Sequence, residues 1–127
     1  MQRLDAWAFS ARLAWGKPWL RFASLVSVVV SIVVGVWFVA QVLPSARANG
    51  TFAYHYNIYV GIDDLRAWWW VFVLPGVWAA LTIVDIVLAY GVYRTDPILA
   101  NSLVTLALLW SLPWCVALFY LTVINSV

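Results

Sequence analysis

Three long apolar runs, separated by short polar stretches, dominate the hydropathy pattern of this chain. Residues 22–43 and 98–124 contain no charged side chain, and residues 67–93 contain only Asp85. A helix needs about 20 predominantly apolar residues to cross the ~30 Å hydrocarbon layer of a bilayer, and each run is long enough. The pattern therefore predicts an all-α membrane protein whose transmembrane helices lie at residues 22–43, 67–93 and 98–124.

The residues before the first run predict a short helix that lies in the membrane interface. Residues 1–21 are basic, with Arg3, Arg12, Lys17 and Arg21. One face of the helical wheel collects apolar side chains, namely Leu4, Trp7, Ala8, Ala11 and Trp15. Such a helix lies flat at the headgroup level, and residues 16–18 would end it. The alternative is a basic flank with some helical content.

The polar segments between the runs are a loop at residues 44–66 and a tight turn at residues 94–97. Within the loop, residues 52–60 alternate with period two, which puts Phe52, Tyr54, Tyr56, Ile58 and Val60 on one side. This alternation predicts an ordered extended segment whose aromatic side packs onto the helix ends or the membrane surface. Gly61 would then allow a turn, and Asp63 and Asp64 would cap the next helix.

The composition fits a single membrane domain over residues 1–127. The chain is 66% hydrophobic and 9% charged, which leaves too little polar surface to cover a soluble globule. Many of its ten tryptophans lie at the ends of the runs, as in an aromatic belt. Five of the seven Lys and Arg residues lie in the N-terminal arm and the turn at residues 94–97, which predicts a cytoplasmic N-terminus and an external loop. Orientation of the chain in the membrane explains these basic residues better than nucleic-acid binding does.

Asp85 is the sharpest candidate for function, because a carboxyl group inside a span costs about 2.5–3.5 kcal/mol on insertion scales. It shares a helix stripe with Trp78, Thr82 and Ala89. Asn101 and Thr105 on the returning third span reach a similar depth, so we expect one of them to bond Asp85 in a polar clasp. The alternative is a proton- or ion-handling role for the carboxyl group.

Two other features are candidates for packing and ligand binding. Ser27, Ser31 and Gly35 follow each other at intervals of four and form a stripe of small residues, which packs either inside the bundle or against another chain. His55 is the only histidine, and we expect it to pin the loop through hydrogen bonds; the alternative is metal or tetrapyrrole ligation. Cys115 is the only cysteine, which excludes a disulfide within the chain. No metal site or cofactor is predicted.

The loop and its flanks resemble a known family. His55, Tyr56 and Asn57 are followed by Gly61 and Asp63, and then by a tryptophan-rich span with an early proline, while Leu-Pro ends the first span. This arrangement over residues 30–89 is similar to the domain of unknown function in bacterial SdpI-type immunity proteins. The resemblance implies a protein of the bacterial inner (cytoplasmic) membrane without enzyme activity, in some cases protective against a toxin.

These features predict a non-enzymatic integral membrane protein that acts through protein–protein contacts. It would be an accessory subunit of a membrane complex or an immunity-like factor, in contact with lipids and with other membrane protein chains. One alternative is a small proton- or ion-coupled transporter, or a ligand-binding membrane protein, that uses Asp85. The other is a subunit of a pigment or haem membrane complex.

Overall fold

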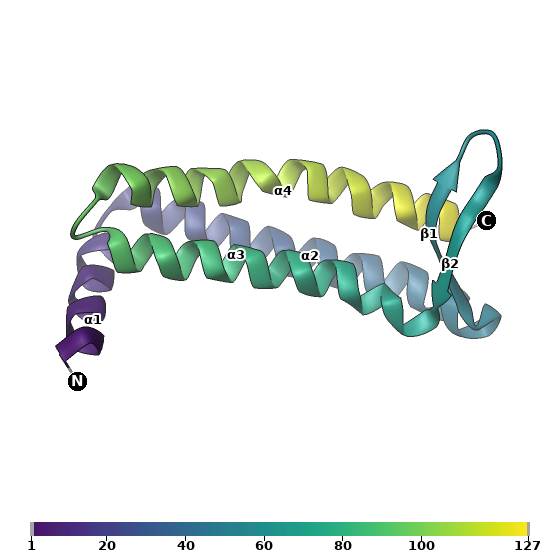
Figure 1. The fold of residues 1–127 in the computed structure, drawn as a ribbon, viewed down its shortest axis with the longest axis horizontal. Helices are drawn as coiled ribbons and strands as arrows, with labels where there is room; N and C mark the ends of the chain where they lie inside the picture. The colour runs from purple at the N-terminus through teal and green to yellow at the C-terminus, as the bar shows by residue number, and fades with distance from the viewer. Residues whose placement is uncertain (1, 127) are drawn as a thin grey trace.

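The computed structural model describes residues 2–126, apart from the side chains at positions 2, 3, 57 and 63. Three long helices form an elongated bundle, a short helix lies across one end of it, and a β-hairpin covers the other end (Figure 1). We call these the α1 end and the hairpin end. The elements in chain order are α1 (Gln2–Trp15), α2 (Pro18–Asn49), β1 (Thr51–Asn57), β2 (Gly61–Ala67), the 3₁₀ helix η1 (Trp68–Phe72), α3 (Val73–Val92) and α4 (Pro97–Asn125).

The three long helices confirm the predicted fold class. Three helical segments, Pro18–Asn49, Trp68–Val92 and Pro97–Asn125, are long and apolar enough to span a membrane. The chain is therefore a multi-pass membrane protein that contacts lipid. Figure 1 shows α2 and α4 running in one direction and α3 in the other, so that the two connections lie at opposite ends of the bundle.

The first span is longer than predicted, because Pro44 does not end it. Helix α2 continues to Asn49 and ends at Gly50, whose φ of 70° is left-handed. A proline in a membrane helix removes one backbone donor, and neighbouring packing can compensate for the loss. Here Ala46, beyond the proline, is buried in the same apolar cluster as Phe52. The loop predicted at residues 44–66 therefore begins only after Asn49.

The stripe of Ser27, Ser31 and Gly35 lies inside the bundle, where all three residues are buried. The serine hydroxyls donate to carbonyl oxygens of their own helix, Ser27 to Ala23 at 2.7 Å and Ser31 to Val28 at 2.9 Å. A Cβ placed on Gly35 would lie 3.1 Å from the Cβ of Pro75 in α3. The small residues thus allow α2 and α3 to approach closely within one chain.

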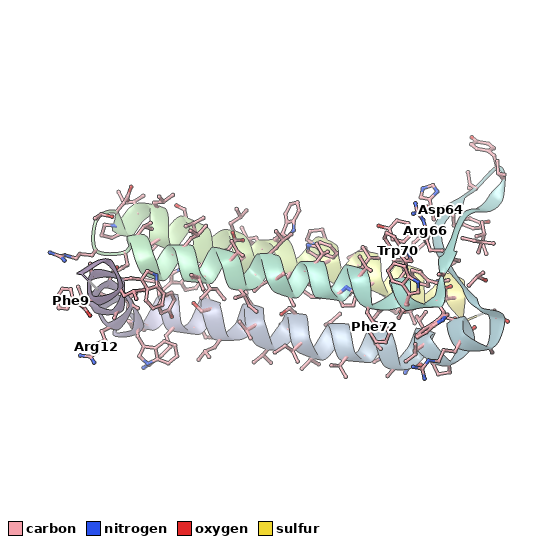
Figure 2. The ribbon with its side chains drawn as sticks, turned by 60° about the horizontal axis from the view of Figure 1, so that its bottom comes forward. Phe9, Arg12, Asp64, Arg66, Trp70 and Phe72 are labelled. Carbon is pink, nitrogen blue, oxygen red and sulfur yellow. The ribbon has the colours of Figure 1, made fainter. Side chains whose placement is uncertain are left out.

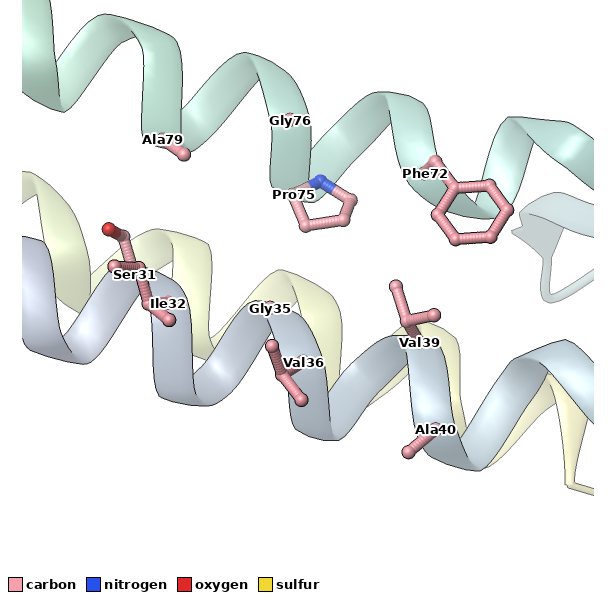
Figure 3. Close-up of a pocket in the computed structure, with 10 residues that line it drawn as sticks. All are labelled: Ser31, Ile32, Gly35, Val36, Val39, Ala40, Phe72, Pro75, Gly76 and Ala79. Atoms are coloured by element: carbon pink, nitrogen blue, oxygen red, sulfur yellow. The ribbon is translucent and has the colours of Figure 1, made fainter.

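A shallow apolar groove of about 470 Å³ opens beside this contact, between α2 and α3. Figure 3 shows Gly35 and Pro75 facing each other at the groove, with Gly76 and Ala79 on the α3 side. A Cβ on Gly76 would meet no atom within 4 Å, so this glycine faces open space. Gly35 and Gly76 therefore differ sharply in what a side chain would meet.

Helix α1 is fixed to the end of α3 by hydrogen bonds and close packing. The Ser10 hydroxyl donates to the Tyr90 carbonyl at 2.8 Å and accepts from the Arg94 amide at 3.0 Å. A Cβ on Gly91 would lie 2.8 Å from the ring of Trp7, so the indole packs directly on this glycine. The break after Trp15 is as predicted, and among the described side chains of α1 those of Ser10 and Ala14 are buried.

Candidate functional site

The loop after α2 folds into an antiparallel β-hairpin, where the sequence predicted one extended segment. Strand β1 pairs with β2 from Thr51 opposite Ala67 to Asn57 opposite Gly61, and a short turn joins them. Gly61 has a φ of 84°, a conformation that glycine adopts without the cost of a Cβ. Gly61 gave a signal for the turn, but the segment after it contains two aspartates and an arginine and gave little signal for a strand.

The predicted alternation holds only for the first half of β1. Phe52 is buried in the core and Tyr54 packs against it, as expected. Register shifts between Ala53 and His55, and again between His55 and Tyr56, then disturb the alternation. Tyr56 is exposed, Asn57 ends β1, and residues 58–60 form the turn. The prediction that Ile58 and Val60 face the bundle was therefore wrong, whereas Tyr56 still lines a cavity between the hairpin and the bundle.

Aromatic rings join the base of the hairpin to the helices. Phe38 of α2 meets Phe52 edge-on, with ring centroids 6.2 Å apart. Phe52 meets Tyr54 at 6.3 Å, and Tyr54 meets Trp70 of η1 at 6.0 Å, both also edge-on. Such edge-to-face pairs add about 0.5–1.5 kcal/mol each beyond their buried area. The rings form a continuous row from α2 to η1.

Arg66 lies over this row and holds Asp64. Its guanidinium lies 4.9 Å from the centroid of Trp70 and 5.6 Å from that of Tyr54. The same guanidinium binds both carboxylate oxygens of Asp64 at 2.9–3.1 Å. Figure 2 shows the side chains of Asp64, Arg66 and Trp70 together. The hydrogen bonds and charge of Asp64 raise the pKa of Arg66. The prediction that Asp64 caps a helix was wrong, because β2 follows the turn and Asp64 pairs along its own strand.

Asn125 ties the last turn of α4 to the hairpin. Its Oδ1 accepts from the Ala53 amide at 2.9 Å, and its Nδ2 donates to the Ala53 carbonyl at 2.9 Å. Nδ2 also donates to the Leu121 carbonyl at 2.9 Å, which fixes the rotamer of Asn125. The side-chain amide thus pairs with β1 as a neighbouring strand would. Sequence reasoning missed this residue; the only signal was a polar amide at the end of the third span.

The turn of the hairpin carries three large, exposed side chains. Ile58 is 81% exposed, Tyr59 92% and Val60 73%. Figure 1 shows the turn reaching past α4, away from the bundle axis. We call Ile58, Tyr59 and Val60 the hairpin tip. The tip is an apolar surface held away from the bundle by a fixed base.

The hairpin brings the residues of the predicted loop motif to neighbouring positions on its two strands, with Asn57 opposite Gly61. His55 lies in β1 opposite Asp64 of β2, and Gly61 begins β2. The side chains of Asn57 and Asp63 lie outside the described residues. Within the part of the chain whose side chains are described, no three His, Cys, Asp or Glu residues come together as a group that could hold a metal ion. His55 lines a cavity of about 300 Å³ under the hairpin, together with Tyr54, Tyr56, Leu74, Ala117, Tyr120 and Leu121.

The structure does not bring Asp85 to Asn101 or Thr105. The Asn101 amide donates to the Pro97 carbonyl at 2.8 Å, and the Thr105 hydroxyl donates to the Asn101 carbonyl at 2.7 Å. Thr105 also accepts from the Trp19 indole of α2 at 3.2 Å. No hydrogen bond between described residues joins either side chain to Asp85.

Helix rotation explains why the polar clasp does not form. Trp78 of α3 stacks on Trp114 of α4, with centroids 5.9 Å apart, so Trp114 marks the side of α4 that faces α3. Asp85 lies about two turns after Trp78 and shares its side of α3. Thr105 lies about two and a half turns from Trp114, and therefore on the opposite side of α4.

Comparison with known proteins adds no relative: no family model, no curated protein and no solved structure matches the chain. The hairpin end combines a fixed aromatic base, an arginine–carboxylate pair and an apolar tip.

Proposed function

We propose that the chain is a non-enzymatic membrane protein that acts through protein–protein contacts, as an accessory subunit of a membrane complex or an immunity-like factor. The hairpin tip is its contact surface. The proposal rests on one observation: the hairpin has an exposed apolar tip, and its base is fixed by Asn125 and the row of aromatic rings. A surface that is already ordered loses little conformational entropy when a partner binds.

The apolar side chains of the tip support a protein partner. Burying Ile58 and Val60 against a partner would contribute about 1.5–3 kcal/mol for each side chain. Within the described residues the sheet has two strands, so β2 has no further strand beside it. Unpaired backbone groups are costly in lipid, whereas a protein partner can bond them. The unpaired edge of β2 and the hairpin tip together favour contact with a protein surface over contact with lipid acyl chains.

Substitution at the tip tests this contact. We expect Ile58→Ser with Val60→Ser to reduce co-purification of the native partner by at least about tenfold, because losing two buried apolar side chains exceeds 1.4 kcal/mol. Native membranes would be solubilised and the tagged chain purified, and its partners quantified by mass spectrometry.

Ile98 provides a matched control for the tip variant, because it is 81% exposed, like Ile58, but lies at the start of α4. Ile98→Ser should leave co-purification unchanged. Equal recovery of the same partners with the tip variant and the parent chain would refute the proposed contact.

We further propose that the α1 end faces the cytoplasm and that the hairpin lies outside, in the bacterial inner membrane. Support comes from the distribution of charge, because the N-terminal arm and Arg94 account for five of the seven Lys and Arg residues. The bond from the Arg94 amide to Ser10 of α1 keeps both segments at one end of the bundle. The hairpin end carries Arg47 and Arg66.

Single cysteines at the two ends test this orientation in a Cys115→Ala background. Asn49→Cys and Thr95→Cys are suitable because both positions are exposed, whereas Gly50 next to Asn49 needs a φ of 70°. A membrane-impermeant maleimide should label position 49 in intact cells and position 95 only after permeabilisation. The reverse pattern would overturn the proposed topology.

A further inference from the structure

A cavity of about 400 Å³ lies at the α1 end, away from the hairpin. Its lining comes from α1 and the end of α3: Trp7, Ala8, Ala11, Arg12, Trp15 and Tyr90. The two alanines leave room between the large rings of Trp7 and Trp15. Figure 1 shows α1 lying across the end of the bundle, and an interfacial helix in this place would put the cavity at the level of the headgroups of a bilayer.

The aromatic walls of this cavity are held in place by the fold. Trp7 packs on Gly91, where a Cβ would lie 2.8 Å from its ring. The Trp15 ring lies 6.3 Å from that of Tyr90, and the Tyr90 hydroxyl accepts from Ser24 at 3.3 Å. Tyr90 itself is buried. These contacts fix the α3 side of the cavity, whereas Trp7 and Trp15 are 43% and 49% exposed and leave it shallow and open.

Arg12 gives the cavity a positive charge, and no carboxylate among the described side chains forms an ion pair with it. Arg12 lines the cavity and is exposed, and Figure 2 shows it extending from α1. Lys17 and Arg21 follow it in sequence and are also exposed. Among the described side chains, no carboxylate forms an ion pair with any of these three; the ion pair that is present joins Arg66 to Asp64 at the other end.

We propose that this cavity binds the headgroup of an anionic phospholipid. The phosphate accepts hydrogen bonds from the Arg12 guanidinium, whose planar donors match phosphate oxygens. The rings of Trp7 and Trp15 cover the glycerol region, where amphipathic indoles are favoured. Lys17 and Arg21 add attraction for a headgroup with negative charge. The bound lipid would fix α1 to the membrane surface.

Lipid titration followed by native mass spectrometry of the full chain in detergent tests the site. We expect the parent chain to retain phosphatidylglycerol at least about fivefold better than phosphatidylcholine, the effect of roughly one basic residue at an anionic surface. Arg12→Gln should abolish this preference. Arg47→Gln removes the same charge at the hairpin end and should keep the preference.

A second variant separates the cavity from the charge. Ala8→Trp fills the space between the indoles and leaves every charge in place, so it should also lose the preference for phosphatidylglycerol. Circular dichroism and gel filtration would show that each variant is folded. An unchanged preference in either Arg12→Gln or Ala8→Trp, or equal retention of the two lipids by the parent chain, would overturn the proposal.

Discussion

Gly35→Leu is expected to destabilise the bundle strongly, whereas Gly76→Leu is expected to be tolerated. At Gly35 even a Cβ would lie 3.1 Å from the Cβ of Pro75, a ring carbon that cannot rotate away. Leucine adds three further carbons, which would force α2 and α3 apart. Overpacking of a close contact costs about 1–3 kcal/mol, and occasionally more.

Gly76 is the matched control because it lies on α3 beside the same groove, with no atom within 4 Å of its Cβ position. Leucine there would face lipid, which it favours, and would replace a poor helix former. Thermal unfolding in detergent, followed by fluorescence-detected gel filtration, should give a clearly lower midpoint for Gly35→Leu only. Equal midpoints for both variants would contradict the proposed contact between α2 and α3.

Asn125→Leu is expected to release the hairpin from α4 without unfolding the three spans. Ala53 is 5% exposed, and the substitution would leave its amide and carbonyl without their partner. An unsatisfied buried group costs about 1–3 kcal/mol, and two groups lose their bonds here. Asn125→Asp keeps an acceptor for the Ala53 amide but turns a carboxylate oxygen toward the carbonyls of Ala53 and Leu121, so it should also release the hairpin.

Hydrogen exchange of residues 51–67 measures this effect directly. Exchange should rise at least about tenfold in Asn125→Leu, because a loss of 1.4 kcal/mol of local stability is a factor of ten. Asn101→Leu is the control, since the Asn101 amide bonds the Pro97 carbonyl of its own helix. Unchanged protection of the hairpin in Asn125→Leu would show that Asn125 does not hold it.

The three spans could be predicted because hydropathy is summed over about 20 residues, so that no single position decides the result. The ends of the spans depend on single residues and were harder to predict. Pro44 suggested the end of the first span, but burial of Ala46 beyond it extends the helix to Asn49. Tertiary packing therefore overrode the local preference of proline.

The hairpin shows a second limit of sequence reasoning. Strict alternation assigns each residue to a side, but one shift of register moves every later side chain to the other face. In β1 two shifts cancel, because Tyr56 opposes Ile62 in the same register as Ala53 opposes Leu65, so the irregular pairing is confined to Tyr54 and His55. The strand tendency of β1 could be read from its sequence, whereas the position of its bulges could not.

Contacts between distant segments could not be predicted from sequence. Asn125 and Ala53 are 72 residues apart, and nothing local to either residue indicates the bond. For Asp85 the helical wheel gave its side of α3, but it did not give the rotation of α4 about its own axis. That rotation turns Thr105 toward Trp19 of α2 and away from the carboxyl group.

Photo-crosslinking from the hairpin tip in native membranes tests the proposed function most directly. A photoreactive amino acid at Val60 should give a discrete adduct with one partner protein, because the tip is exposed and its base is fixed. The same probe at Leu112, which is 66% exposed in the middle of α4, should give no such adduct, because lipid surrounds it. Absence of a protein adduct at Val60, or the same adducts from both positions, would contradict a partner-binding role for the hairpin.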